Sequence, residues 1–122
     1  MPDVFHYQRR VEFCETDAAG IAHFSSFFLY MEQAEHAFLR SVGLSVDSDM
    51  PPSQPGERPT HVSWPRVKAD CEFQSGARFE EVLDIAVRIA RLGEKSVTYA
   101  FEITCSGRAV ATGHMVSVFC AI

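Results

Sequence analysis

The sequence lacks the residue patterns of a metal-binding, disulfide-linked or membrane-spanning protein. Its four cysteines, Cys14, Cys71, Cys105 and Cys120, are widely separated, and no two of them form a C-x-x-C pair of the kind found in zinc sites. The five histidines show no H-E-x-x-H spacing. No apolar run approaches the ~20 residues that a helix needs to cross a bilayer. We therefore expect no metal, no cofactor and no membrane segment.

Positive charge is also sparse. Eleven Lys and Arg residues face sixteen Asp and Glu residues, for a net charge of -5, and Arg9-Arg10 is the one adjacent basic pair. Nucleic-acid-binding proteins normally carry a basic stripe, so the charge pattern argues against that class. The first residues lack the charged start and apolar stretch of a signal peptide, which predicts a cytoplasmic protein.

The residues that are present indicate one globular domain over residues 1–122. Nearly half of the chain, 47%, is hydrophobic, which is enough to form a core. Apolar residues recur at helical spacing from about residue 25 to 42, followed by Gly43 where a helix often ends. Alternating apolar and polar residues predict strands elsewhere, at about 4–13, 66–73, 83–90, 97–105 and 109–119. Phe5, Tyr7, Val11 and Phe13 are expected to share the inner face of the first strand.

The order of these elements, one strand, one long helix and four more strands, predicts an α+β fold. A curved antiparallel sheet of five strands would wrap around the helix and cover it with one face. Residues 45–59 are rich in Ser, Asp and Pro and are expected to form an irregular connection. The other face of the sheet would be partly apolar, which favours self-association through that face or through an edge strand. Its apolar residues are Ala86, Ala90, Ala100, Val110, Val116 and Val118.

Asp17 is the most interesting single residue. It lies on an expected turn between the first strand and the helix, with Gly20 to allow a sharp bend and with Ser25 and Ser26 as candidate helix caps. A carboxylate beside a helix N-terminus can attack or accept a proton while the free N–H groups of the helix stabilise an oxyanion. The alternative is an ordinary turn aspartate that hydrogen-bonds its own backbone.

The arrangement resembles the hot-dog-fold acyl-CoA thioesterases, specifically the 4-hydroxybenzoyl-CoA thioesterase family. Residues 16–21, Thr-Asp-Ala-Ala-Gly-Ile, are similar to the family's D-x-x-G-[IV] signature. Residues 77–79, Ala-Arg-Phe, resemble its small-basic-aromatic step into a strand, and residues 95–97, Lys-Ser-Val, resemble the segment after its hairpin. These motifs are short, but their order and spacing extend over nearly the whole chain.

The resemblance implies hydrolysis of an acyl-CoA thioester to a carboxylate and a free thiol. Asp17 would be the nucleophile or the general base, and the backbone N–H of Phe24 would donate to the thioester carbonyl. Gly20 and Ile21, from the signature, would contact the substrate. His23 stands where relatives often carry an aromatic residue; it could orient water, hydrogen-bond Asp17 or line the acyl pocket.

Further substrate contacts are expected from three residues outside this segment. Trp64 could form a wall of the acyl pocket or belong to the core. In the hairpin, Gly93-Glu94 stands where some relatives have consecutive arginines for the phosphates of coenzyme A. Arg88, Arg91 and Lys95 remain as candidates, and Arg88 is more simply a solvated surface charge. This departure leaves both coenzyme A and an acyl-carrier protein open as the thiol carrier.

The resemblance also implies a homodimer whose two sheets join edge to edge, with a homotetramer as a further step. Coenzyme A would enter as part of the substrate and not as a cofactor. In this setting Glu35, near the border of the apolar stripe of the helix, is expected to form a salt bridge at the rim with a neighbouring subunit.

Two other functions remain open at this point. An acyl-thioester hydratase or dehydratase of the same fold would use an aspartate–histidine pair, for which Asp17 and His23 are available. A non-catalytic module that binds acyl thioesters would use the same groove without releasing a thiol.

Overall fold

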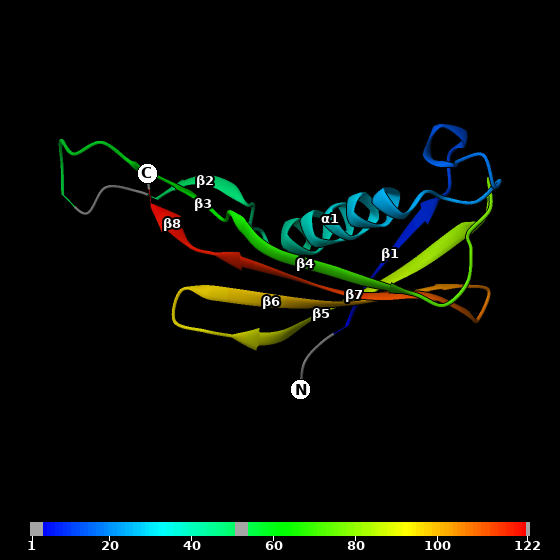
Figure 1. Ribbon diagram of the computed structural model, residues 1–122. Helices are drawn as coiled ribbons and strands as arrows, with labels where there is room; N and C mark the ends of the chain where they lie inside the picture. Colours follow the sequence, from blue (N-terminus) through cyan, green and yellow to red (C-terminus); the bar gives the residue numbers. More distant parts are fainter. Residues whose placement is uncertain (1–3, 51–53, 122) are drawn as a thin grey trace.

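The computed structural model describes residues 4–50 and 54–121. Two sheets and one long helix make up its regular structure (Figure 1). The elements are β1 Phe5–Arg10, the 3-10 turn η1 Phe13–Glu15, α1 Phe24–Ser41, β2 Asp47–Met50, β3 Thr60–Ser63, β4 Arg66–Phe73, β5 Val82–Leu92, β6 Ser96–Cys105, β7 Arg108–Val118 and β8 Cys120–Ala121.

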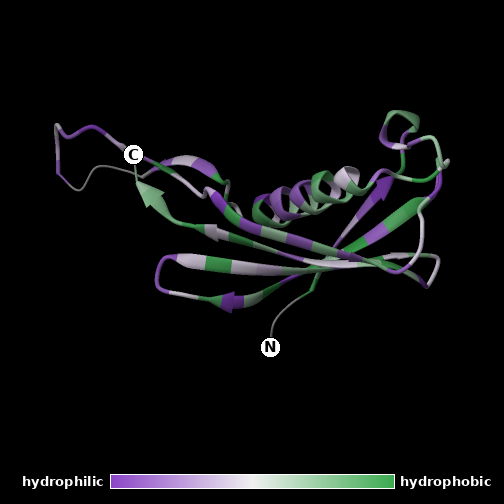
Figure 2. Ribbon diagram, viewed as in Figure 1, coloured by the Kyte–Doolittle hydropathy of each residue, from purple (hydrophilic) through white to green (hydrophobic). Residues whose placement is uncertain are grey.

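The main sheet has five strands in the order β1-β5-β6-β7-β4, and all neighbouring strands are antiparallel. Helix α1 lies across one face of this sheet (Figure 1). Along the strands, hydrophilic and hydrophobic residues alternate, as expected for a sheet with one face on the core (Figure 2). The predicted α+β fold, with five antiparallel strands around one helix, is confirmed.

The helix forms where the apolar stripe predicts it, and it buries that stripe against the sheet. Phe27, Tyr30, Met31 and Ala34 are at most 2% exposed. The helix begins at Phe24, and the prediction that a serine caps it is wrong. His23 has the extended backbone of an N-cap, and its ring accepts a hydrogen bond from the amide of Ser25.

A glycine allows the helix to lie close to the middle of the sheet. A Cβ atom added to Gly113 on β7 would lie 2.6 Å from the sulfur of Met31 and 2.6 Å from the carbonyl oxygen of Asp70. Neither neighbour leaves room for a methyl group, because the first is fully buried and the second belongs to the backbone of β4. The distance between α1 and the sheet therefore depends on the absence of a side chain here.

The first strand is shorter than predicted. β1 ends at Arg10, and the chain turns through η1, so Phe13 is 74% exposed and does not share the inner face of Phe5 and Tyr7. Its ring packs edge-on against Phe79 at 5.6 Å instead. The alternating pattern continued past Arg10 in the sequence, but it could not show that the backbone leaves the sheet there.

Val110 also lies on the other side of the sheet from the one predicted. Ile103 pairs with Ala111 and Thr104 pairs with Ala109, so Val110 is an extra residue on β7 with no partner on β6. Such a bulge reverses the side-chain alternation, and Val110 is fully buried in the core.

A second, smaller sheet, which was not predicted from the sequence, combines two strands that follow the helix with the last strand of the chain. Strand β3 pairs with β2 on one side and with the short strand β8 on the other. These strands lie beyond the C-terminal end of α1 (Figure 1). Asp and Ser at 47–49 disfavour strands intrinsically, so the pairing depends on tertiary context. Within the described residues, no helix combines the length and the apolar character that a membrane span requires.

Candidate active site

The Asp17 segment forms a closed turn between η1 and the helix. The amide of Asp17 donates to the carbonyl of Ile21 at 3.0 Å, and the amide of Gly20 donates to the carbonyl of Asp17 at 2.9 Å. Gly20 has φ +80 with open space around its Cα, so the turn requires glycine for its backbone conformation and not for lack of room. Thr16 and Ala22 form a β-bridge that closes the base of the turn.

The Asp17 carboxylate is both a turn residue and an available acid. Its Oδ1 accepts a hydrogen bond from the amide of Ala19 at 2.8 Å, which is the local contact expected of a turn aspartate. Within the described residues no donor contacts Oδ2. One oxygen thus orients the side chain, and the other is free to react.

The first turn of α1 begins directly beside this loop. The amide of Phe24 is the first N–H of the helix, and the described part of the chain supplies no acceptor for it. The Nδ1 atom of His23 is occupied by Ser25, whose amide donates to it at 3.2 Å, and the imidazole stacks on the ring of Phe24 with centroids 4.3 Å apart. No hydrogen bond joins His23 to Asp17 among the described residues. Asp17 and His23 of one chain therefore do not form a hydrogen-bonded aspartate–histidine pair within the described residues.

Asp17 and Phe24 line one cavity of about 350 Å³. Aromatic rings form much of its wall: Phe27 packs edge-on against Phe73 with ring centroids 5.1 Å apart. The remaining lining residues come from the signature turn and from the segment after β4, namely Ile21, Ala22, Gln74, Ser75 and Gly76. Asp17, whose Oδ2 has no donor, and Phe24, whose backbone N–H has no acceptor among the described residues, therefore belong to the lining of the same largely apolar cavity.

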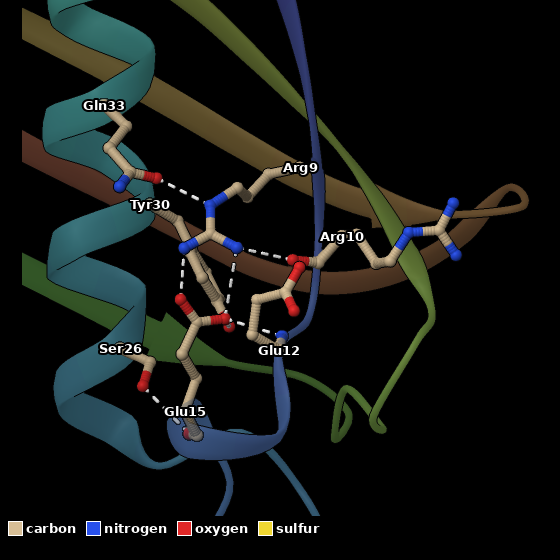
Figure 3. A network of polar contacts seen from close by, with 7 residues as sticks. All are labelled: Arg9, Arg10, Glu12, Glu15, Ser26, Tyr30 and Gln33. Carbon is tan, nitrogen blue, oxygen red and sulfur yellow. Dashed lines mark hydrogen bonds and ion pairs between the residues drawn. The ribbon is translucent and has the colours of Figure 1, made fainter.

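A buried polar network is centred on Glu15, two residues before Asp17 in the chain (Figure 3). Glu15 is 8% exposed, and its carboxylate accepts hydrogen bonds from the amide of Glu12 at 2.8 Å and from the hydroxyl of Tyr30 at 2.9 Å. The guanidinium of Arg9 donates to both oxygens of this carboxylate. Gln33 in turn accepts a hydrogen bond from Nε of Arg9 at 2.7 Å.

The protonation states of this network follow from its contacts. Burial alone would raise the pKa of Glu15, but the hydrogen bonds from the Glu12 amide, Arg9 and Tyr30 outweigh it and hold the pKa below its ordinary value. Burial and the hydrogen bond to Glu15 raise the pKa of Tyr30. Near neutral pH Glu15 is therefore a carboxylate acceptor, and Tyr30 is a neutral donor.

This network was not predicted from the sequence, although one signal for it was present. Arg9 lies on the same face of β1 as Phe5 and Tyr7, and a charged residue on a buried face indicates a buried partner. The identity of that partner was not visible, because Glu15 lies in a turn and Tyr30 looked like an ordinary member of the apolar stripe.

The structure does not bring the other three candidates to Asp17 of the same chain. Trp64 packs edge-on against Phe119 at 5.4 Å, and the amide of Phe119 donates to the carbonyl of Lys95. Lys95 and Arg91 belong to the exposed β5–β6 hairpin. In Figure 1 this hairpin and the start of β4 lie at the C-terminal end of α1, whereas the Asp17 segment lies at its N-terminal end.

Glu35 forms a salt bridge within its own chain, contrary to the predicted rim contact with a neighbour. It is 1% exposed, and its carboxylate accepts from the guanidinium of Arg66 at 2.8 and 3.2 Å. The side chain of Arg66 also donates to Ser117 at 3.3 Å. This is the second buried carboxylate–arginine pair after Glu15–Arg9; it joins α1 to β4 and lies apart from the Asp17 turn.

Comparison with known proteins places this chain in a family. The family model of the thioesterase-like superfamily matches residues 11–122. A protein of Aquifex aeolicus is 33% identical over 107 residues, covering 88% of this chain and 77% of the relative. A 1,4-dihydroxy-2-naphthoyl-CoA hydrolase of Prochlorococcus marinus is 29% identical, covering 85% of this chain and 69% of the relative. The chain therefore belongs to the thioesterase-like superfamily, and it is a hot-dog enzyme of the acyl-CoA thioester hydrolase class.

Solved structures agree with this assignment. A gentisyl-coenzyme A thioesterase superimposes with a TM-score of 0.77 at 27% identity, covering 98% of this chain and 93% of the other. A protein of Aquifex aeolicus superimposes with a TM-score of 0.79 at 26% identity, covering 96% and 86%. The resemblance stated from the sequence is confirmed at the level of fold and family.

Proposed function

We propose that this protein hydrolyses an aromatic acyl-CoA thioester, with Asp17 and the Phe24 amide at the reaction centre. The observation that carries the proposal is the shared cavity: its lining includes Asp17, which has one free carboxylate oxygen, Phe24, whose helix N–H is unpaired, and the phenyl rings of Phe27 and Phe73. The names of two relatives support the aromatic class, because one acts on a naphthoyl thioester and the other on a gentisyl thioester.

The chemistry can proceed by two routes through the same atoms. In the first, a carboxylate oxygen of Asp17 attacks the thioester carbon, the C–S bond breaks, and water then hydrolyses the resulting anhydride. In the second, Asp17 accepts a proton from a water molecule that attacks the same carbon. In both routes the amide of Phe24, at the positive end of the α1 dipole, donates to the oxygen that becomes negative. Each route yields a carboxylate and a free thiol.

A panel of acyl-CoA substrates, followed with a thiol-reactive dye, tests the proposed substrate class. We expect aromatic acyl groups to give kcat/KM values roughly tenfold or more above those of short linear acyl groups, because ring contacts in the wall add binding that a short chain does not gain. The same acyl group carried on an acyl-carrier protein tests the thiol carrier. Thiol release from short linear substrates with equal efficiency would contradict the aromatic assignment, and tight binding without release would contradict the activity itself.

We further propose that two copies complete the site by pairing along β4. This strand is an edge of the main sheet, and it exposes apolar side chains, with Val67 59% and Phe73 49% exposed. The Phe73 end of β4 lines the Asp17 cavity, and Trp64 precedes the other end. Antiparallel pairing about a twofold axis places each end of β4 opposite the other end of its counterpart. Trp64 of one copy would then lie near Asp17 of the other copy. Arg91 and Lys95 lie at the same end of their own chain as Trp64.

Co-production of Asp17→Asn and Trp64→Ala chains tests this composite site. We expect each variant alone to be impaired and the mixture to recover roughly a quarter of wild-type activity, since half of randomly formed dimers are mixed and each mixed dimer holds one intact site. Mixing Asp17→Asn chains with the doubly substituted chain is the control, because no intact site can form. Mixed dimers that are detected by native mass spectrometry but show no recovery would contradict the composite site, as would a fully active Trp64→Ala enzyme.

A further inference from the structure

The backbone of Glu15 connects the two halves of the proposed reaction centre. Its carbonyl accepts hydrogen bonds from the amide of His23 at 2.8 Å and from the hydroxyl of Ser26 at 2.9 Å. His23 immediately precedes Phe24, and Glu15 precedes Asp17 by two residues. One carbonyl group thus links the start of the Asp17 turn to the start of the helix.

The side chain of Glu15 fixes this carbonyl in place. Its carboxylate is buried and receives hydrogen bonds from the η1 backbone, from Tyr30 on α1 and from Arg9 on β1 (Figure 3). These three donors come from three different elements, so movement of Glu15 relative to any of them breaks a charge-assisted hydrogen bond. The guanidinium of Arg9 lies over the ring of Tyr30 at 5.1 Å, which closes the network on itself.

We propose that Glu15 is a positioning residue for thioester hydrolysis, setting the placement of the Asp17 carboxylate relative to the Phe24 amide. This inference rests on the function proposed above. The Glu15 side chain is absent from the lining of the cavity, so it acts through Asp17 and Phe24 and not on the substrate. A fixed relative placement is valuable because displacing a reacting group by about 1 Å can lower a rate by about 10².

Glu15→Gln tests the proposal with the smallest change in shape. The amide keeps one oxygen acceptor, but its NH₂ group would face donors from Arg9 or the backbone. We expect kcat to fall roughly tenfold while KM changes by no more than about threefold, because the ground-state contacts with the acyl group remain. Tyr30→Phe, which removes a single donor and keeps the ring, is expected to lower kcat by a few-fold in the same direction. It also provides a test should Glu15→Gln fold poorly.

Glu35→Gln is the matched control. It disrupts another buried carboxylate–arginine pair, whose carboxylate lies on α1 and contacts neither the Asp17 turn nor the first turn of that helix. The urea unfolding midpoints of both variants are measured beside their kinetics. A loss of stability in Glu35→Gln without the loss of kcat seen in Glu15→Gln supports a positioning role. Equal losses of kcat at equal losses of stability would overturn it.

A double-mutant cycle separates this inference from the proposed function. If Glu15 acts through Asp17, adding Glu15→Gln to Asp17→Asn leaves the residual rate of thiol release unchanged. A further tenfold loss in the double variant would overturn the positioning role while the function stands. Wild-type kcat in Asp17→Asn alone would overturn the proposed role of Asp17 at the reaction centre whatever Glu15→Gln does.

Discussion

Asp17→Asn is expected to lower kcat for thioester hydrolysis by about 10²–10⁴, the range associated with a positioned general base, while the fold remains intact. The asparagine can keep the turn, because its amide oxygen can still accept from the amide of Ala19, as Oδ1 of Asp17 does. What it loses is the charge and the basicity of the other oxygen. Since Asp17 is exposed, the free energy of unfolding should change by no more than about 0.5 kcal/mol.

The measurement is steady-state thiol release from the best aromatic substrate, together with urea unfolding of the same preparation. Glu102→Gln provides the control, because it removes an exposed carboxylate on the opposite face of the sheet. A purified Asp17→Asn protein with near wild-type turnover would eliminate Asp17 from the mechanism.

The same substrate can distinguish the two chemical routes. In a single turnover in ¹⁸O-labelled water, nucleophilic attack by Asp17 followed by attack of water on the Asp17 carbonyl of the anhydride gives the product an oxygen from the enzyme, and the label is found in the Asp17 carboxylate. General-base catalysis transfers the label directly to the product. Label in the peptide that contains Asp17, found by mass analysis, therefore identifies Asp17 as the nucleophile.

Phe24→Pro is expected to lower kcat by about 10²–10³, the usual cost of losing one oxyanion donor. Proline removes the backbone N–H and nothing else that the helix needs, because the first helical position has no intrahelical acceptor and favours proline. The preceding residue, His23, has φ -64 and ψ 147, which is compatible with a following proline. The helix should therefore form normally without its first donor.

The loss of the phenyl ring is controlled with Phe24→Ala. That ring is 61% exposed and stacks on His23, so its removal should alter KM more than kcat. A kcat ratio near one between the alanine and proline variants would show that the Phe24 amide is not an oxyanion donor. Circular dichroism of both variants establishes that α1 is retained.

Much of the fold could be predicted because apolar periodicity reflects burial. Strands β4 to β7 and helix α1 lie close to their expected ranges, since each buries one face. The errors arise where the backbone changes course without a change in pattern: at Arg10, where β1 ends early, and at Val110, where a bulge reverses the alternation. Strands β2, β3 and β8 were not predicted, because their pairing depends on segments that are far apart in the sequence.

The site was predictable to the extent that it is local in sequence. Asp17, Gly20 and Phe24 lie within one short segment, and turn chemistry followed by a helix start was enough to suggest their arrangement. The Glu15 network joins three elements, and no local pattern encodes the hydrogen bond between Glu15 and Tyr30. Trp64, Arg91 and Lys95 lie at the opposite end of the chain's own helix, so a local sequence pattern could not show whether they share a site with Asp17.

The tight contact at Gly113 has a consequence for redesign of the acyl specificity. The helix and the sheet cannot be moved apart to make room for the acyl group. Met31 of α1 lies against Gly113 of β7, and a wider gap between them would leave a void beneath the helix. Room for a bulkier acyl group must instead come from replacing aromatic residues at the opening of the Asp17 cavity by smaller ones. Phe73 is an example, because it is half exposed and contributes less to the core. Variants that accept larger thioesters should therefore be sought among residues at the opening of the Asp17 cavity and not along the contact between helix and sheet.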